Sequence, residues 1–224
     1  MDEHFQHAPL HSNLPVMLAL IAFWYREYFG TSSQLIAPYH EDLRHFPAYL
    51  QQLEMESNGK SVTRKGEPTP MKTSAVIWGS TGTNNQHAYF QMLHQGSDLI
   101  PVDFIASIAP GDQLDPAHHR TLLMNCLAQG AALMAGKASE DPARAYPGDR
   151  PSTTFLLDNC DAAALGALIA FHEQRTFANA VLMGINPFDQ FGVELGKAIA
   201  KQIDSGEGSF DPSTQALMAA AGLT

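Results

Sequence analysis

Short and long apolar stretches alternate along the 224-residue chain, and their lengths separate the expected strands from the expected helices. Short apolar runs bounded by Gly, Pro or polar residues predict strands at residues 34–37, 75–78, 99–108 and 152–157. Longer segments with capping residues predict helices at residues 14–29, 42–55, 84–94, 116–137, 161–181, 189–203 and 212–221. This alternation predicts a doubly wound α/β fold, a mostly parallel sheet with helices on both faces and further helices at the C-terminus.

Three details of this pattern make local predictions. Asn13 is placed to cap the helix at residues 14–29, and Gly30 to end it. That helix is apolar on most sides, so we expect it at the centre of the fold. We expect Pro38 to close the first strand. Pro47 leaves two alternatives for the second helix, a kink or a true first turn.

Length and composition indicate a soluble globular protein. A chain of 224 residues, 45% hydrophobic and 16% charged, suits one α/β domain over residues 1–224. The formal net charge of -10 argues against a nucleic-acid partner, because phosphate backbones are bound by surplus Lys and Arg. It leaves a small anionic substrate possible, since a few cations and backbone N–H groups hold one phosphate.

Cysteine usage and the apolar stretches favour a cytoplasmic protein with no membrane partner. Cys126 and Cys160 lack metal spacing and are expected to be buried, reduced thiols. The acidic N-terminus has no signal-peptide features. The longest apolar stretch, residues 14–25, is shorter than the roughly 20 residues that a bilayer crossing needs.

Loops and helix ends carry the candidate chemistry. The Gly-rich turn at residues 79–83 precedes a helix and favours anions, although taken alone it is more often a structural turn. His87, just after it, could exchange protons near neutral pH or simply pack. Glu54 and Glu56 both lie where the second helix ends, and position alone does not choose between them.

Gln190 and Lys197 are two turns apart on the helix expected at residues 189–203, so we expect them on one face, as pocket groups or as solvated surface residues. The sequence has neither His-Glu-x-x-His nor Gly-x-Ser-x-Gly, which argues against a zinc site and a serine hydrolase. The residues alone suit proton transfer on a small anionic ligand.

Three segments together resemble the glucose-6-phosphate isomerase family. They are Gln-Gln-Leu-Glu-Met-Glu-Ser-Asn-Gly-Lys at residues 51–60, Gly-Thr-Asn-Asn-Gln-His-Ala at residues 82–88, and Gly-Ile-Asn-Pro-Phe-Asp-Gln-Phe-Gly-Val-Glu-Leu-Gly-Lys at residues 184–197. Two departures are Leu53, where the family commonly has Gly, and Ser80-Thr81, where an acidic residue and Pro are more usual.

The resemblance implies the interconversion of glucose 6-phosphate and fructose 6-phosphate, in glycolysis and gluconeogenesis, without a metal or organic cofactor. It makes Glu56 the base that moves a proton between C1 and C2 through an enediol. His87 would assist ring opening, and Lys197 would act on the ring or C1 oxygens. Gln52 and Gln190 match glutamines that line the substrate pocket.

Family members are longer, with two sugar-isomerase-type domains. Their first domain supplies a Ser/Thr-rich phosphate loop, and a Gly-Gly-Arg segment supplies an arginine that steadies the enediolate; neither is found here. We therefore expect residues 1–224 to be the C-terminal sugar-isomerase-type domain of a longer homodimeric enzyme, inactive in isolation. The family's histidine comes from the partner subunit, so Glu56 and His87 of one chain would serve different sites. The alternative is a non-catalytic module of the same fold that binds sugar phosphates or another protein.

Overall fold

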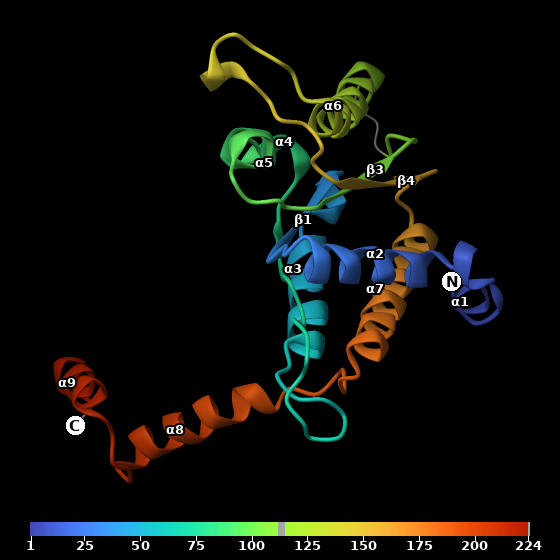
Figure 1. Cartoon of the computed structure of the whole chain (residues 1–224). Coiled ribbons are helices and arrows are strands. Elements are labelled where there is room, and N and C mark those ends of the chain that lie inside the picture. The colour runs from blue at the N-terminus through green and yellow to red at the C-terminus, as the bar shows by residue number, and fades with distance from the viewer. Residues whose placement is uncertain (112–114, 224) are drawn as a thin grey trace. The chain divides into compact units, whose positions relative to one another are not determined.

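The computed structural model describes residues 1–111 and 115–223, and in these residues four parallel strands form one sheet in the order β2-β1-β3-β4 (Figure 1). The strands are β1 (Ser33–Tyr39), β2 (Val76–Gly79), β3 (Val102–Ser107) and β4 (Ser152–Leu157). From β1 the chain adds β2 on one side, and then β3 and β4 on the other. The predicted parallel sheet is confirmed.

Helices cover both faces of this sheet. The α-helices are α1 (Asp2–His7), α2 (Leu14–Tyr28), α3 (Phe46–Leu50), α4 (Gly82–Ala88), α5 (Phe90–Gln95), α6 (Pro116–Ala135), α7 (Ala162–Met183), α8 (Glu194–Ser205) and α9 (Pro212–Ala220). Shorter turns of 3₁₀-helix are η1 (Leu10–Ser12), η2 (Glu41–Leu43), η4 (Pro142–Arg144) and η5 (Phe191–Val193). Helices α4, α5 and α6 lie over one face and α3 and α7 over the other, where α2 packs on α7 (Figure 1). The doubly wound α/β fold predicted from the alternation is therefore confirmed.

Alternate residues of β1 serve two separate cores. Leu35, Ala37 and Tyr39 point into the core beneath α5 and α6, while Ile36 points into the core beneath α3 and α7. Because both faces are covered, the central strands are buried along most of their length and show continuous apolar runs. The edge strand β4 instead alternates between exposed and half-buried positions.

Pro38 lies inside β1, so the prediction that it closes the strand is wrong. The Leu35 N–H donates to Pro101 O, on the β3 side. Neighbouring residues alternate sides, so the nitrogen of Pro38 faces the β2 side. There β2 ends at Gly79, opposite Ile36, and an N–H at position 38 would find no strand partner.

The helix at residues 14–29 forms, but its predicted central position is wrong. Asn13 Oδ1 accepts the Val16 N–H at 3.4 Å, as a cap should. Leu18 and Ala19 are buried on one side of α2, while Trp24 remains 56% exposed on another. One face of α2 therefore packs inside the described chain and the other does not.

Two predicted helices are interrupted. The helix expected at residues 84–94 breaks at Tyr89, whose φ of -146° leaves the helical region. The Tyr89 hydroxyl donates to Asn85 Oδ1, and its ring packs against Trp78 with centroids 4.7 Å apart. The helix expected at residues 42–55 is also interrupted, because η2 ends at Leu43 and α3 begins only at Phe46. Pro47 lies in the first turn of α3, so of the two alternatives, a kink or a true first turn, the structure shows the first turn.

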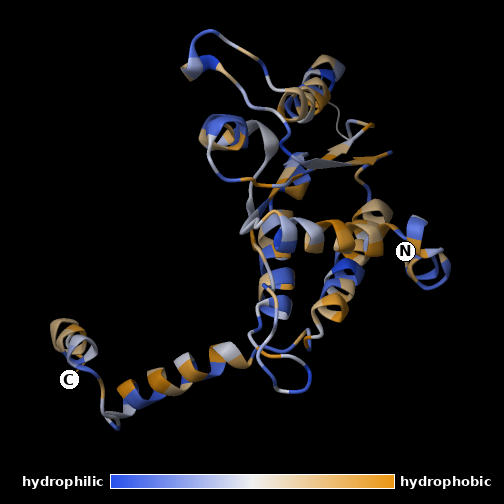
Figure 2. Cartoon of the chain, in the orientation of Figure 1, coloured by the Kyte–Doolittle hydropathy of each residue, from blue (hydrophilic) through white to orange (hydrophobic). Residues whose placement is uncertain are grey.

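The described chain separates into two compact units, Met1–Phe188 and Asp189–Thr224. The first contains the sheet and helices α1 to α7; the second contains η5, α8 and α9. In α8, Leu195 and Ile199 follow one another at helical spacing among polar residues, which makes the helix amphipathic (Figure 2). The expectation of one domain over residues 1–224 stays a prediction about the longer protein.

Both cysteines carry free thiols. Cys126 is buried, as predicted, and burial raises its pKa to about 12. Cys160 is half-buried, so the prediction of full burial is wrong there. None of the helices in the described residues has the length and apolarity to cross a membrane.

Candidate functional site

The segment that carries Gln52 and Glu56 is a π-helix, η3 (Gln51–Glu56), which continues α3 and runs into two further helical residues. The sequence predicted an ordinary α-helix here. Short π-helical segments are rare and frequently mark functional sites. Gln52 and Glu56 lie four residues apart and so share one side of the segment, where Gln52 is exposed and Glu56 is half-buried.

Glu54 lies on the opposite side of the same segment and is only 8% exposed. Its Oε1 accepts a hydrogen bond from Asn58 Nδ2 at 3.2 Å, and its Oε2 accepts one from Thr176 Oγ1 at 2.8 Å. Asn58 Nδ2 also donates to the Thr176 carbonyl oxygen at 3.1 Å. These contacts join η3 to the middle of α7. Of the two carboxylates, Glu54 is therefore bound inside the fold and Glu56 faces outward.

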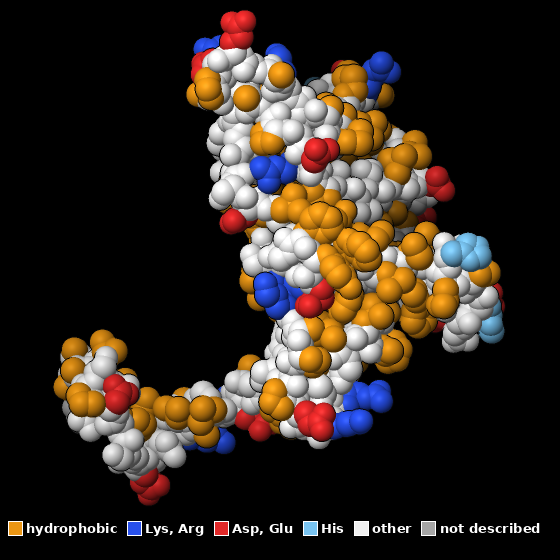
Figure 3. Space-filling view, in the orientation of Figure 1, with side chains coloured by type: hydrophobic (Ala, Val, Ile, Leu, Met, Phe, Trp, Pro, Cys, Tyr) orange, Lys and Arg blue, Asp and Glu red, His pale blue; other side chains and the backbone are white. Residues whose placement is uncertain are grey.

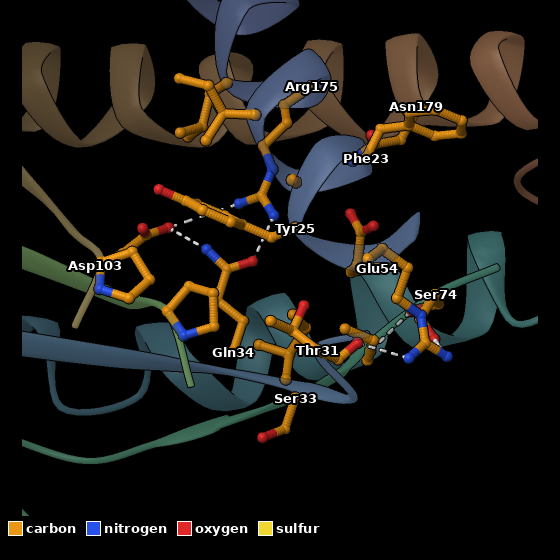
Figure 4. A pocket seen from close by; sticks show the side chains of 18 of the residues that line it. Phe23, Tyr25, Thr31, Ser33, Gln34, Glu54, Ser74, Asp103, Arg175 and Asn179 are labelled. Atoms are coloured by element: carbon orange, nitrogen blue, oxygen red, sulfur yellow. Dashed lines mark hydrogen bonds and ion pairs between the residues drawn. The ribbon is translucent and has the colours of Figure 1, made fainter. Parts of the chain in front are cut away.

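The neighbouring residue on α7, Arg175, joins that helix to the sheet. Arg175 Nη2 donates to Gln34 Oε1 at 2.7 Å, and Arg175 Nη1 lies 3.6 Å from Asp103 Oδ2. Gln34 Nε2 donates to the same Asp103 oxygen at 2.6 Å, which closes a triangle of side chains from α7, β1 and β3 (Figure 4). Burial raises the pKa of Asp103 to about 6, against the opposing effects of Arg175 and Gln34.

A cavity of about 50 Å³ lies beside this triangle, between α2, α7 and the amino ends of the strands. Glu54, Asp103, Arg175 and Asn179 are among the residues that line it (Figure 4). Glu56 is not among the described residues of its lining. Ligands of open α/β sheets bind beyond the carboxyl ends of the strands, at the other edge. This cavity is thus not the site that the sequence predicted.

His87 lies on α4, where it is exposed. Helices α4 and α5 cover one face of the sheet, whereas η3 contacts α3, α7 and the edge strand β2 on the other. His87 and Glu56 therefore lie on elements that cover opposite faces of the sheet. Gly82, which begins α4, packs against the Tyr39 ring: a Cβ there would lie 2.1 Å from Tyr39 Cε2. This supports the structural interpretation of the Gly-rich turn.

Gln190 and Lys197 belong to the second compact unit, and one expectation about them is wrong. Helix α8 begins only at Glu194, and Gln190 precedes the 3₁₀ turn η5. The two residues consequently do not share a helix face. Lys197 is exposed on the first turns of α8, and Gln190 is exposed ahead of η5.

Among the described residues, no group of three or more His, Cys, Asp or Glu side chains is placed to hold a metal ion. Comparison with known proteins then decides the family. The family model described as Phosphoglucose isomerase matches residues 1–218. The chain belongs to the phosphoglucose isomerase family.

Relatives named glucose-6-phosphate isomerase share high identity over the whole chain. The protein from Erythrobacter litoralis (strain HTCC2594) is 62% identical, over 100% of this chain and 44% of its own length. The protein from Rhizorhabdus wittichii is 61% identical, over 99% of this chain and likewise 44% of its own length. The chain thus spans less than half the length of these phosphoglucose isomerases.

Solved structures agree with this assignment. A glucose-6-phosphate isomerase from Chlamydia trachomatis superposes with a TM-score of 0.91 at 36% identity, over 100% of this chain and 44% of that one. A protein of Thermus thermophilus described as hypothetical superposes with a TM-score of 0.69 at 26% identity, over 90% of this chain and 47% of that one. The arrangement of strands and helices is therefore that of a phosphoglucose isomerase segment.

Two features of this phosphoglucose isomerase segment escaped the sequence analysis. The Glu54–Thr176 bond joins residues 122 positions apart, and the Gln34–Arg175 bond joins residues 141 positions apart. A single sequence holds no signal for such pairings. For the burial of Glu54 the sequence holds a weak signal, because residues two apart on a helical segment point to different sides, so Glu54 and Glu56 cannot both face the same way.

Proposed function

We propose that the chain is the C-terminal portion of a glucose-6-phosphate isomerase, and that Glu56 is the base of that enzyme. The observation that carries the proposal is the contrast between the two acids of η3. Both carboxylate oxygens of Glu54 are bound, by Asn58 and Thr176, while Glu56 lies on the outer side with Gln52. A base must reach the carbon-bound proton of its substrate, so the outward carboxylate is the suitable one.

The reaction assigned to Glu56 is a proton transfer within the open-chain sugar phosphate. The carboxylate takes the C2 proton of glucose 6-phosphate, and the electron pair of that C–H bond forms the C1–C2 double bond of an enediol as O1 gains a proton. The carboxylic acid then returns its proton to C1, while O2 loses one, and fructose 6-phosphate results. Gln52, on the same side of η3, is suited to hydrogen-bond the sugar hydroxyls.

His87 and Lys197 are proposed to assist ring opening, as the family resemblance implies. His87 is exposed on α4, which covers the face of the sheet opposite η3, and this favours a role for His87 in the active site of a second copy of the enzyme in a homodimer. Lys197 would act on the ring or C1 oxygens, and Gln190 would line the pocket. These roles require a complete active site, which also needs groups that hold the substrate phosphate.

The exposed apolar surface of the first unit supports a larger parent protein. Leu14, Trp24, Tyr28 and Phe29 of the α2 segment are each more than half exposed. Figure 3 shows hydrophobic side chains gathered over α2 and α7. Contiguous apolar surface of this kind marks contact with further protein. We propose that the remaining part of the enzyme covers it, and that the enzyme works in the cytoplasm.

A fusion protein tests the proposed function. Residues 1–224 are joined behind the part of the Erythrobacter litoralis relative that they do not match, and conversion of fructose 6-phosphate is followed in a coupled assay. We expect turnover in the fusion and negligible turnover in the chain alone, because each missing positioning group is commonly worth about 10²-fold or more. Glu56→Gln should abolish turnover in the fusion and leave sugar-phosphate binding largely intact, since the amide cannot accept the proton.

A folded fusion that binds sugar phosphate without turning it over would instead support the non-catalytic module. Full turnover by Glu56→Gln would show that the base is another residue.

A further inference from the structure

We propose that Glu54 is a positioning residue, whose buried carboxylate holds the π-helical segment so that Gln52 and Glu56 face the substrate. This inference rests on the proposed role of Glu56. It concerns a different group, one that touches no reacting atom and acts through the backbone of η3.

The two oxygens of Glu54 bind two different parts of the chain. Oε1 accepts from Asn58 Nδ2, which belongs to the helical residues that follow η3, and Oε2 accepts from Thr176 Oγ1 on α7. Asn58 and Thr176 are 0% and 1% exposed, so these hydrogen bonds are shielded from water. A buried donor that loses its acceptor has no solvent to replace it, which makes such bonds costly to break.

A π-helical segment depends on contacts of this kind. Its backbone departs from the regular α-helical pattern, and such segments are rare and mostly a single turn long. The helical pattern after η3 ends at Gly59, whose N–H donates to Met55 O at 2.9 Å and where a Cβ would lie 2.3 Å from the same oxygen. The chain then turns sharply, because the Lys60 N–H donates to Asn58 O at 2.8 Å. Side-chain anchoring of η3 to α7 therefore supports a conformation that local preference does not.

The support to which Glu54 attaches is itself fixed. Arg175, next to Thr176, ties α7 to the sheet through Gln34 and Asp103. Thr176 thus presents its hydroxyl from a helix that is held against β1 and β3. Glu54 transmits that placement to η3, and Glu56 lies on the far side of the same turn.

Four variants of the fusion protein test this role. Glu54→Leu removes both acceptor oxygens and places an apolar side chain in the buried site. Misplacing a catalytic group by about 1 Å can cost about 10²-fold, so we expect kcat to fall about 10- to 100-fold, with a much smaller change in KM. Thr176→Val removes one of the two donors to Glu54, so it should also lower kcat, but by less than Glu54→Leu does. Thr176→Ser, which keeps the hydroxyl, should retain the turnover of the parent fusion.

Glu54→Gln is the rescue variant. Its amide oxygen can accept from Asn58 and its amide nitrogen can donate to the Thr176 hydroxyl, so kcat should stay within about threefold of the parent fusion. All rates are measured well below each variant's melting temperature and per mole of folded protein. If Glu54 only stabilises the fold, the variants should have lower melting temperatures but an unchanged kcat per mole of folded protein.

The outcomes separate the two proposals. Loss of kcat in Glu54→Leu and Thr176→Val, with recovery in Glu54→Gln and Thr176→Ser, supports positioning. If Glu56→Gln is inactive while Glu54→Leu and Thr176→Val keep full kcat, the role of Glu54 is overturned and that of Glu56 stands. If Glu54→Gln loses as much as Glu54→Leu, hydrogen-bonded positioning is overturned. If Glu56→Gln stays active, the proposed function of Glu56 is the one that fails.

Discussion

Arg175 Nη1 on α7 lies 3.6 Å from Asp103 Oδ2 on β3, and both side chains are almost fully buried. A buried ion pair is not automatically stabilising, because removing two charges from water costs more than their attraction returns unless further hydrogen bonds assist. Gln34 supplies those bonds to both partners. The raised pKa of Asp103 shows that burial outweighs them for this carboxyl.

Asp103→Asn should therefore change how stability depends on pH. The folded-state pKa of Asp103 is about 6 against an ordinary value of 3.8, so the folded state binds the proton more tightly. The contribution of Asp103 to the free energy of unfolding is fully present below about pH 4 and is lost as the pH rises through about 6. About two pKa units correspond to about 3 kcal/mol. Between pH 4 and pH 7 the unfolding free energy of the wild type should fall by about this amount relative to Asp103→Asn.

Denaturant unfolding at several pH values makes this measurement. The exposed Asp98 provides a control, and Asp98→Asn should follow the wild-type pH dependence. A difference between wild type and Asp103→Asn that is the same at pH 4 and pH 7 would contradict the prediction.

His172 should have the opposite pH dependence. Burial, and then the nearby charge of Arg175, lowers the pKa of His172 well below 6.5, and the ring lies among Phe46, Phe155 and Phe171. Below pH 6.5 the unfolded chain binds a proton at His172 and the folded chain does not, so the free energy of unfolding decreases as the pH falls below that value. His172→Phe should reduce this loss, measured as the unfolding free energy at pH 7 minus that at pH 5.

The exposed His11 is the matched control for that experiment. His11→Gln should leave the difference between pH 7 and pH 5 as it is in the wild type. An unchanged difference in His172→Phe would contradict the prediction, because it would mean that the folded protein and the unfolded chain bind the proton of His172 equally well.

Two glycines should respond in opposite ways to substitution by Ala. At Gly82 the new Cβ would lie 2.1 Å from the Tyr39 ring, whereas at Gly166, inside α7, it would meet nothing within 4 Å. Overpacking typically costs about 1–3 kcal/mol, so Gly82→Ala should destabilise the chain by about that amount. Gly166→Ala should stabilise it by about 0.5–1 kcal/mol, because Ala favours a helix interior. Thermal unfolding of the pair tests both signs, and equal effects would contradict the packing account.

His87→Ala and Lys197→Ala should separate ring opening from carbon proton transfer in the fusion protein. If both groups act at the ring oxygens, each change should slow turnover of the cyclic sugar phosphate far more than deprotonation of an open-chain analogue, which needs no ring opening. Small and equal effects would indicate a packing histidine and a solvated lysine. Large and equal effects would indicate that the residues hold the substrate or the fold.

The sequence predicted the sheet well, for a clear physical reason. The strand at residues 152–157 has the same bounds in the structure, and the cap at Asn13 forms as expected. Apolar runs and capping side chains are local signals, so a single sequence carries them. The exposed face of α2 was mispredicted, because apolar residues that face away from the described core look the same in sequence as those that face it.

The candidate site was less accessible to sequence reasoning. The residues of η3 are good α-helix formers, and nothing in their order predicts a π-helix. Position alone did not choose between Glu54 and Glu56. The family resemblance chose Glu56, and the buried contacts of Glu54 now give that choice independent support. The roles of Gln52, Glu56, His87, Gln190 and Lys197 stay predictions until the variants are measured.

The position of Thr176 and Arg175 late in the first compact unit has a consequence for synthesis. Thr176 follows its partner Glu54 by 122 residues, and Arg175 follows Gln34 by 141. At about 5–20 residues per second, roughly 6 to 24 s pass on the ribosome between the appearance of Glu54 and that of Thr176. During this interval η3 has no α7 to hold it, and the apolar core face beneath α7 stays open to water. The core face beneath α7 can therefore be buried only after α7 itself, Ala162–Met183, has been synthesised.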